Sequence, residues 1–213
     1  MTHRLSPHVH AACCGEDLVL LNLRQGSYAC LPGCAPYIAL SAGTTALRVG
    51  AQDLAQALVE AGAIETGPAQ LRFVAPPAAR DLAARRPGRR ARPLTMALAW
   101  SELARSYWRV PFGEMIARSQ RKANGACGDE ALVGRLAHDF ARMLPWVPAQ
   151  GVCLYRSCFL LAFLRRHGVS ASWVFGVQTY TFEAHCWLQA GDLVLDDHLE
   201  HVAGFEPILA LEP

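Results

Sequence analysis

Three residues in the last third of the chain, Cys153, His185 and Asp197, have the side chains needed for thiol-based acyl chemistry. A thiol becomes a nucleophile when a base takes its proton, and a third group can orient that base. Cys153 opens an apolar run that reads as a helix, and the other two residues fall on strand-like segments joined by a Gly-Asp turn. The sequence therefore predicts a thiol enzyme that acts on an acyl group.

The expected position of Cys153 at a helix start, just after Gly151, suits a nucleophile. Free backbone N–H groups and the positive end of the helix dipole favour a thiolate there, and Arg156 adds positive potential. The same N–H groups can hold an oxyanion. The alternative is that Cys153 is a buried structural cysteine, as we expect for Cys158 within the helix.

The hairpin that carries His185 has more than one possible register. A three-residue loop over 190–192 pairs His185 with Asp197 on one face, with Cβ atoms about 5 Å apart. A two-residue turn at 191–192 pairs His185 with His198 instead, and another register selects Asp196. Spacing alone leaves the register open.

Two metal sites are alternatives to metal-free thiol chemistry. The eight cysteines form no pair of Cys-x-x-Cys hooks, although Cys30 and Cys34 lie near the pair at 13–14 in a separation that zinc permits. His198 and His201 could also hold a metal together with Asp196. We expect no metal and no organic cofactor, because thiol chemistry requires neither.

Composition bounds the class of protein. The chain has 213 residues, is 52% hydrophobic and 18% charged, and carries a net charge of only +2. These values suit a packed globular protein. The small net charge gives no overall electrostatic field that would attract nucleic acid or a membrane surface. No targeting segment is visible, and the longest apolar run, 158–164, is too short to span a bilayer. We expect a cytoplasmic protein with reduced thiols.

A proline- and arginine-rich stretch at 76–93 predicts a linker between modules at 1–75 and 94–213. The arginines repel one another and favour a solvated segment, although they could also contact an acidic partner. They stand at positions 80, 85, 86, 89, 90 and 92.

The N-terminal module has the pattern of a small winged-helix-like unit. Strands are expected at 17–23 and 27–31 around a turn, and a helix at 52–61. The module is not strongly basic and has no helix suited to reading base edges. An open hairpin edge can instead accept a peptide as an added strand.

The C-terminal module has the pattern of an α+β domain. Helices are expected at 94–108, 131–144 and 153–167, followed by strands at 169–181, 182–190 and 193–197.

Several motifs resemble a known family. C-L-Y-R-S from Cys153, L-R-R-H-G-V at the helix end, A-H-C-W around His185 and V-L-D-D ending at Asp197 are similar to the lasso-peptide B proteins. These are transglutaminase-like, papain-like cysteine proteases that remove leader peptides. The hairpin D-L-V-L-L-N-L-R-Q-G-S-Y-A-C-L resembles a PqqD-like recognition element for leader peptides of RiPPs (ribosomally made, modified peptides), so the chain looks like the fused form.

The resemblance implies a role for each residue of the triad. Cys153 would be the nucleophile, His185 the general base and then acid, and Asp197 the orienting group, which selects the three-residue loop. Two positions depart from the family pattern: Cys186 stands where alanine is usual, and Gln178 where a basic residue often occurs.

The resemblance also implies a substrate and a partner. The leader of a lasso precursor would add as a strand beside 27–31, and an ATP-dependent macrolactam synthetase would use the freed core peptide. Two other functions stay open: another acyl transferase, such as a transglutaminase or arylamine acetyltransferase, and a non-catalytic precursor-binding chaperone. The expected leader-binding residues are Tyr28, Ala29, Cys30, Leu54 and Leu58, and the expected oxyanion donors are Cys153 with Gln150 or Trp146.

Overall fold

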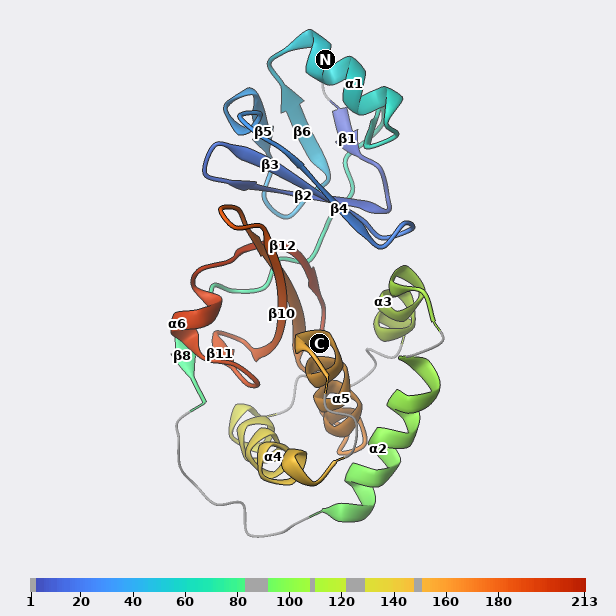
Figure 1. The fold of residues 1–213 in the computed structure, drawn as a ribbon, viewed down its shortest axis with the longest axis vertical. Helices are drawn as coiled ribbons and strands as arrows, with labels where there is room; N and C mark the ends of the chain where they lie inside the picture. Colours follow the sequence, from blue (N-terminus) through green and yellow to red (C-terminus); the bar gives the residue numbers. More distant parts are fainter. Residues whose placement is uncertain (1–2, 83–91, 108–109, 122–128, 148–150) are drawn as a thin grey trace.

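The computed structural model describes residues 3–82, 92–107, 110–121, 129–147 and 151–213 (Figure 1). Its N-terminal half is mostly strands, and its C-terminal half combines a sheet with helices. The N-terminal elements are β1 His3–Leu5, β2 Val9–Cys14, β3 Asp17–Asn22, β4 Ser27–Leu31, a 3-10 turn Ala35–Tyr37, β5 Ile38–Leu40, β6 Ala46–Val49, α1 Gln52–Glu60 and β7 Ile64–Glu65. The elements that follow are β8 Arg80–Asp81, α2 Pro93–Ser106, α3 Phe112–Arg121, α4 Glu130–Met143, a 3-10 turn Leu144–Trp146, α5 Cys153–Arg165, β9 Ser172–Gln178, β10 Glu183–Ala190, β11 Leu193–Val194, α6 Leu199–Val202 and β12 Glu206–Leu211.

The three-stranded sheet β2-β3-β4 joins the two halves of the molecule (Figure 1). Successive residues of a strand point to opposite faces. Leu18 and Leu20 therefore enter the N-terminal core, whereas Val19 and Leu21 enter the larger core of the C-terminal half. Burial on both faces explains why the strand is an almost continuous apolar run.

The N-terminal half differs from the winged-helix-like unit expected from the sequence. The expected hairpin is present as β3 and β4, and the expected helix as α1. Between residues 3 and 82, however, α1 is the single α-helix, and β5 and β6 join β1 and β7 in a second sheet. Leu47 on β6 is buried while Arg48 is exposed, so alternating burial and pairing with two strands favour a strand there.

The C-terminal half is built around helix α5, which lies between a five-stranded sheet and the helices α2 and α4 (Figure 1). The strand order is β12-β9-β10-β11-β8. Because α5 has neighbours on several sides, it is apolar almost all round, and Phe159, Leu160 and Phe163 are fully buried. This helix and sheet together position the predicted triad.

The first part of the expected linker at 76–93 is largely exposed, as expected of a solvated segment, but it is also attached to the C-terminal sheet. Arg80–Asp81 forms β8, which pairs in parallel with β11. The Arg80 guanidinium makes ion pairs with Asp192 and Glu130, and the Pro76 carbonyl accepts a hydrogen bond from Gln189 at 2.7 Å. The sheet edge supplies backbone partners that the sequence pattern does not reveal. Of the six arginines, those at 85, 86, 89 and 90 lie outside the described residues.

The helices of the described residues are all too short or too polar to cross a bilayer, and the longest, α2 and α4, have 14 residues each.

Candidate active site

Cys153 is the first residue of α5, as expected. Val152 precedes it with extended backbone geometry, and the Val152 carbonyl accepts the N–H of Arg156, which begins the helix. The first N–H groups of a helix have no partner within it. The half-buried Cys153 thiol therefore lies at the positive end of the helix dipole, next to backbone donors.

Asp196 fixes the start of α5 to the strand that carries His185. Its carboxylate accepts a hydrogen bond from the Ser157 hydroxyl at 2.6 Å and another from the Leu188 N–H at 2.7 Å. Burial raises the pKa of Asp196 to about 6, although both hydrogen bonds oppose that shift. Asp196 is thus a structural link between helix and sheet, and it is not the group that orients His185.

The register that the resemblance selects for the hairpin is wrong. Ala190 pairs with Leu193 and Gln189 with Val194, so Gly191-Asp192 is a two-residue turn. Gly191 has a φ of 60°, which two-residue hairpin turns need at their first central position. The pairing ends soon after β11, because the Asp196 side chain takes the Leu188 N–H. Beyond this point the chain leaves the ladder, and Asp197 still reaches His185.

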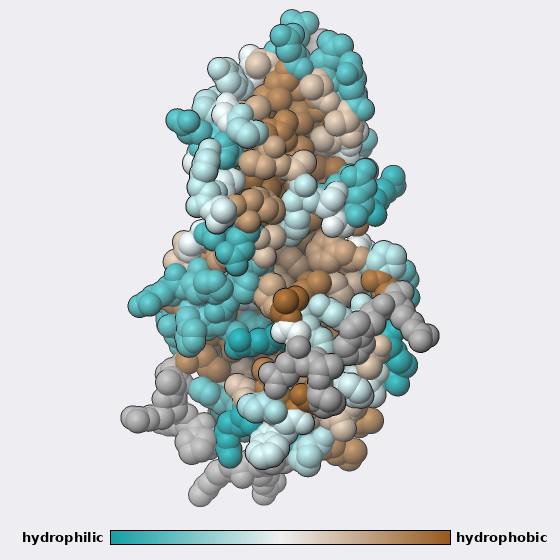
Figure 2. Space-filling model, in the orientation of Figure 1, coloured by the Kyte–Doolittle hydropathy of each residue, from teal (hydrophilic) through white to brown (hydrophobic). Residues whose placement is uncertain are grey.

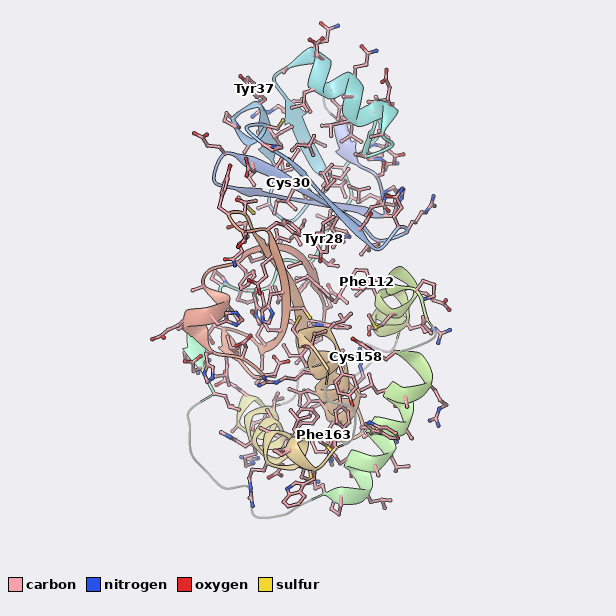
Figure 3. All side chains as sticks on the ribbon, in the orientation of Figure 1. Tyr28, Cys30, Tyr37, Phe112, Cys158 and Phe163 are labelled. Carbon is pink, nitrogen blue, oxygen red and sulfur yellow. The ribbon has the colours of Figure 1, made fainter. Side chains whose placement is uncertain are left out.

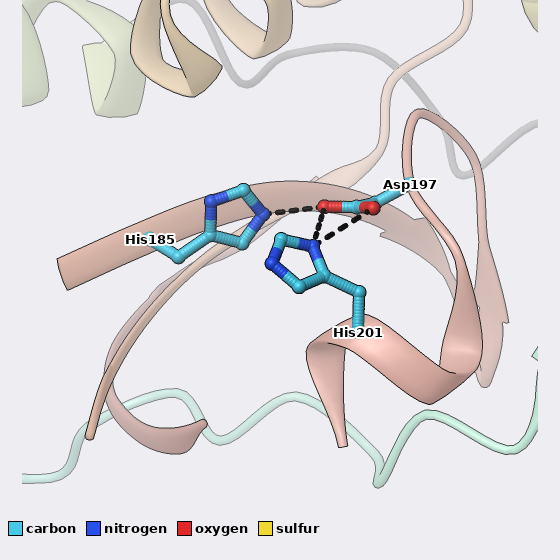
Figure 4. Close-up of side chains that lie close together, drawn as sticks. All are labelled: His185, Asp197 and His201. Carbon is cyan, nitrogen blue, oxygen red and sulfur yellow. Dashed lines mark hydrogen bonds and ion pairs between the residues drawn. The ribbon is translucent and has the colours of Figure 1, made fainter. Parts of the chain in front are cut away.

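The Asp197 carboxylate holds the Nε2 atom of His185, as the triad requires (Figure 4). It also accepts the His198 N–H at 2.7 Å and bonds the Nδ1 atom of His201 at 3.0 Å. Burial opposes the charge on Asp197, but these hydrogen bonds outweigh burial and hold its pKa well below the usual range. Asp197 is therefore ionised and oriented.

His185 is held as a strong base. Burial lowers its pKa, but hydrogen bonds to Asp197 and Cys153 outweigh burial and raise the pKa to about 9. Its ring stacks on Trp187, with centroids 6.1 Å apart, and packs against Phe205 at 5.1 Å. Because Asp197 occupies Nε2, the other ring nitrogen, Nδ1, is left for the thiol.

The Cys153 sulfur is stabilised as a thiolate by Cys186 and His185. A hydrogen bond with the Cys186 thiol is the main cause that lowers the pKa of Cys153; bonds with His185 and with the Cys186 backbone add to it, and burial opposes it. The same bond and burial raise the pKa of Cys186. The arrangement gives a thiolate and an imidazolium side by side, which is the reactive form of a cysteine–histidine pair.

The expected oxyanion donors have different positions. The Cys153 N–H lies at the helix start, where such a donor is needed. Gln150 lies outside the described residues. The Trp146 side chain is 89% exposed, in the 3-10 turn Leu144–Trp146, and this exposure does not favour a role inside the site.

The expected leader-binding residues separate into two groups. Leu58 is buried and Leu54 partly buried in the N-terminal core, so both serve packing, whereas Ala29 and Cys30 on β4 are exposed. Tyr28 lies at the boundary of the two halves (Figure 3) and contacts Phe182, with ring centroids 5.7 Å apart. Burial raises the pKa of Tyr28 to about 12, and the nearby thiols of Cys186 and Cys153 add to this shift.

Two residues of this site were missed by the sequence interpretation. His201 was considered only as a metal ligand, although its spacing of four from Asp197 suits a contact across one helical turn. Cys186 was noted only as a departure from the family pattern. The expected sets of metal ligands are not brought together: among the described residues, one group of three side chains lies close enough, and it is His185, Asp197 and His201.

A thiolate at a helix start, facing a histidine on an adjacent sheet that is held by an aspartate just beyond the sheet, is the arrangement of a cysteine-dependent acyl-transfer site. Residues 94–210, more than half of the chain, match the family model of the transglutaminase-like superfamily, and the chain belongs to this superfamily. No curated protein and no solved structure matches the chain. Members of the superfamily are typically cysteine-triad enzymes, so membership indicates a cysteine-based hydrolase or acyltransferase.

Proposed function

We propose that this protein is a leader peptidase of lasso-peptide biosynthesis, which hydrolyses the amide bond between leader and core of a precursor peptide. The observation that carries the proposal is the position of strand β4, which packs against the cores of both halves. Its outer edge has no neighbouring strand in the described residues, and its Tyr28, like Cys153, packs against the core of the C-terminal half. A peptide bound along β4 would therefore lie near the thiolate.

The proposed chemistry uses only Cys153, His185 and Asp197. The thiolate attacks the carbonyl carbon, and the Cys153 N–H helps to hold the oxyanion. His185 gives its proton to the departing amine as the C–N bond breaks, which leaves a thioester. Water then adds with His185 as base, the C–S bond breaks, and the leader leaves with a free carboxylate. Asp197 keeps Nε2 of His185 hydrogen-bonded throughout.

The recognition half is proposed to bind the leader as an added strand. Main-chain hydrogen bonds along an open sheet edge give affinity, and side-chain pockets give specificity. Figure 2 shows hydrophobic residues gathered over the N-terminal strands and down toward the C-terminal half, which suits an apolar stretch of leader. Binding there would raise the effective concentration of the scissile bond at Cys153.

The product suggests the partner. Cleavage releases a core peptide with a free α-amine, and ring closure onto a side-chain carboxyl requires activation of that carboxyl. We therefore propose an ATP-dependent macrolactam synthetase as the enzyme that uses this amine.

The test is mass spectrometry of a precursor peptide, taken from a short reading frame beside the gene, after incubation with the protein. Wild type should release a leader with a free carboxylate and an intact core, and the sum of their masses should exceed the precursor by one water. Cys153→Ala should leave the precursor intact, whereas Cys158→Ala should cleave it.

Other outcomes would contradict the proposal. A precursor that loses ammonia and gains an amine would indicate a transglutaminase. A precursor that binds but stays intact with wild type, under reducing conditions and with the synthetase present, would indicate a non-catalytic chaperone.

A further inference from the structure

A second histidine, His201, shares the Asp197 carboxylate with His185 (Figure 4). One imidazole on the aspartate is sufficient for a triad, so His201 needs a separate explanation. One ligand atom from each of His185, Asp197 and His201 lies within 4.8 Å of the other two, and the nitrogens that contact Asp197 are Nε2 of His185 and Nδ1 of His201. We propose that these three atoms form a binding site for a zinc ion, and that bound zinc holds the enzyme inactive.

The donor set fits zinc. Zinc binds imidazole nitrogen and carboxylate oxygen at about 2.0–2.2 Å, and sites with two histidines and one carboxylate keep a fourth position for water. A tetrahedral ion at these bond lengths separates its ligand atoms by roughly 3.3 Å. The 3.0 Å between His201 Nδ1 and Asp197 is close to that separation, so small side-chain shifts are sufficient.

The ligands are already held in place. His201 packs edge-on against Phe205, with ring centroids 5.4 Å apart, and lies 4.6 Å from the His185 ring. His201 lies on the short helix α6 and Asp197 two residues before it, so the turn of this helix brings the two side chains together. Little ordering of side chains is therefore needed when the ion binds.

The site is accessible from one side. The His201 side chain is 49% exposed, whereas those of His185 and Asp197 are 10% and 13% exposed. An ion can therefore approach past His201, and a water molecule can complete its coordination from the solvent.

Binding at this position would stop the reaction. Zinc takes the nitrogen lone pairs that face Asp197, and the two ring protons now shared with that carboxylate move to the other ring nitrogens or to solvent. His185 bound through Nε2 keeps its proton on Nδ1, but giving that proton to the departing amine would leave an imidazolate, so the ring is no longer the acid that the imidazolium is. This inhibition rests on the proposed function, but the binding of zinc does not.

Zinc binding to the reduced full-length protein tests the proposal, measured by competition with a chromogenic chelator. Wild type should bind one zinc ion here, and His201→Gln should weaken that binding by more than about tenfold. His198→Gln is the matched control, because His198 is an exposed neighbour outside the cluster, and it should bind zinc as wild type does.

Cys153→Ala separates this site from a direct zinc–thiolate complex. The proposed site lies on the Asp197 side of the His185 ring, so Cys153→Ala should keep its zinc affinity within about threefold. Cobalt bound in place of zinc should show no thiolate charge-transfer band. Loss of zinc binding in Cys153→Ala, wild-type binding by His201→Gln, or no binding by wild type would each overturn the proposal. If the zinc-free protein cleaves the precursor but does not bind zinc, this proposal alone is refuted. If the protein binds zinc but its zinc-free form does not cleave, only the peptidase is refuted.

Discussion

At the scale of single residues, the chemistry depends on hydrogen bonds that act on Cys153 and His185 in opposite directions. Cys186 and His185 lower the pKa of the thiol, while Asp197 and the thiolate raise the pKa of His185 to about 9. The charged pair is therefore stable from the lowered pKa of Cys153 up to about pH 9. Each limb of a pH profile can be assigned to one of these contacts.

The acidic limb of the pH profile should shift when Cys186 is replaced. Cys186→Ala removes the thiol that hydrogen-bonds Cys153, so the pKa of Cys153 should rise and its alkylation by iodoacetamide should need higher pH. The rate at Cys153 can be followed against pH by peptide mass spectrometry. Cys158→Ala, further along α5, is the control and should leave the profile unchanged. An unchanged profile in Cys186→Ala would refute the contact.

The alkaline limb of the pH profile should shift when Asp197 is replaced. Asp197→Asn removes the negative partner of His185, so the pKa of His185 should fall and the decline of kcat/KM should move to lower pH. The rate should also drop by at least about a hundredfold, since the amide no longer holds the productive form of the ring. The measurement is precursor cleavage from about pH 5 to pH 10. His198→Gln is the control, and an alkaline limb that stays near pH 9 in Asp197→Asn would contradict the assignment.

At the scale of elements, α5 and the β10–β11 hairpin bring the triad together, and β4 offers the proposed binding edge. Helix α5, β3, β4 and the residues that carry the chemistry could be predicted from apolar periodicity and residue type. The hairpin register was mispredicted because Asp197 reaches His185 without pairing opposite it: the chain leaves the ladder at Asp196, and no local pattern encodes that departure. Strand β8 was missed because its partner β11 lies more than one hundred residues away. The contact between His201 and Asp197 depends on α6, a single turn whose pattern is too short to recognise.

The open edge of β4 can be tested with a labelled synthetic leader peptide. Ala29→Arg places a long charged side chain on this exposed strand and should weaken leader binding by about fivefold, or ~1 kcal/mol, in fluorescence anisotropy. Ala69→Arg makes the same change at an exposed alanine outside any strand or helix. Equal affinities for the two variants would place leader binding elsewhere.

At the scale of the whole molecule, the two halves share a core through β3, since Val19 and Leu21 pack with residues of the C-terminal domain. Leu21→Ala should therefore destabilise the C-terminal domain by about 2–5 kcal/mol, although Leu21 lies outside it in sequence. All five tryptophans lie between residues 94 and 213, so their fluorescence during denaturation reports on that domain. Val59→Ala, at an exposed position of α1, should change stability by less than about 0.5 kcal/mol. Tryptophan unfolding unaffected by Leu21→Ala would show that the halves fold independently.

The central claim, that Cys153 is an activated nucleophile, is tested most directly by the relative alkylation rates of the cysteines. At about pH 6, Cys153 should react with iodoacetamide at least about tenfold faster than Cys30, although Cys30 is exposed and Cys153 is half-buried. Burial and Asp17 raise the pKa of Cys30, which makes it an internal reference. Cys186→Ala should remove most of the advantage of Cys153, and His185→Gln should remove part of it. If Cys30 reacts as fast as Cys153 in the wild-type protein, Cys153 is not activated and the account is contradicted.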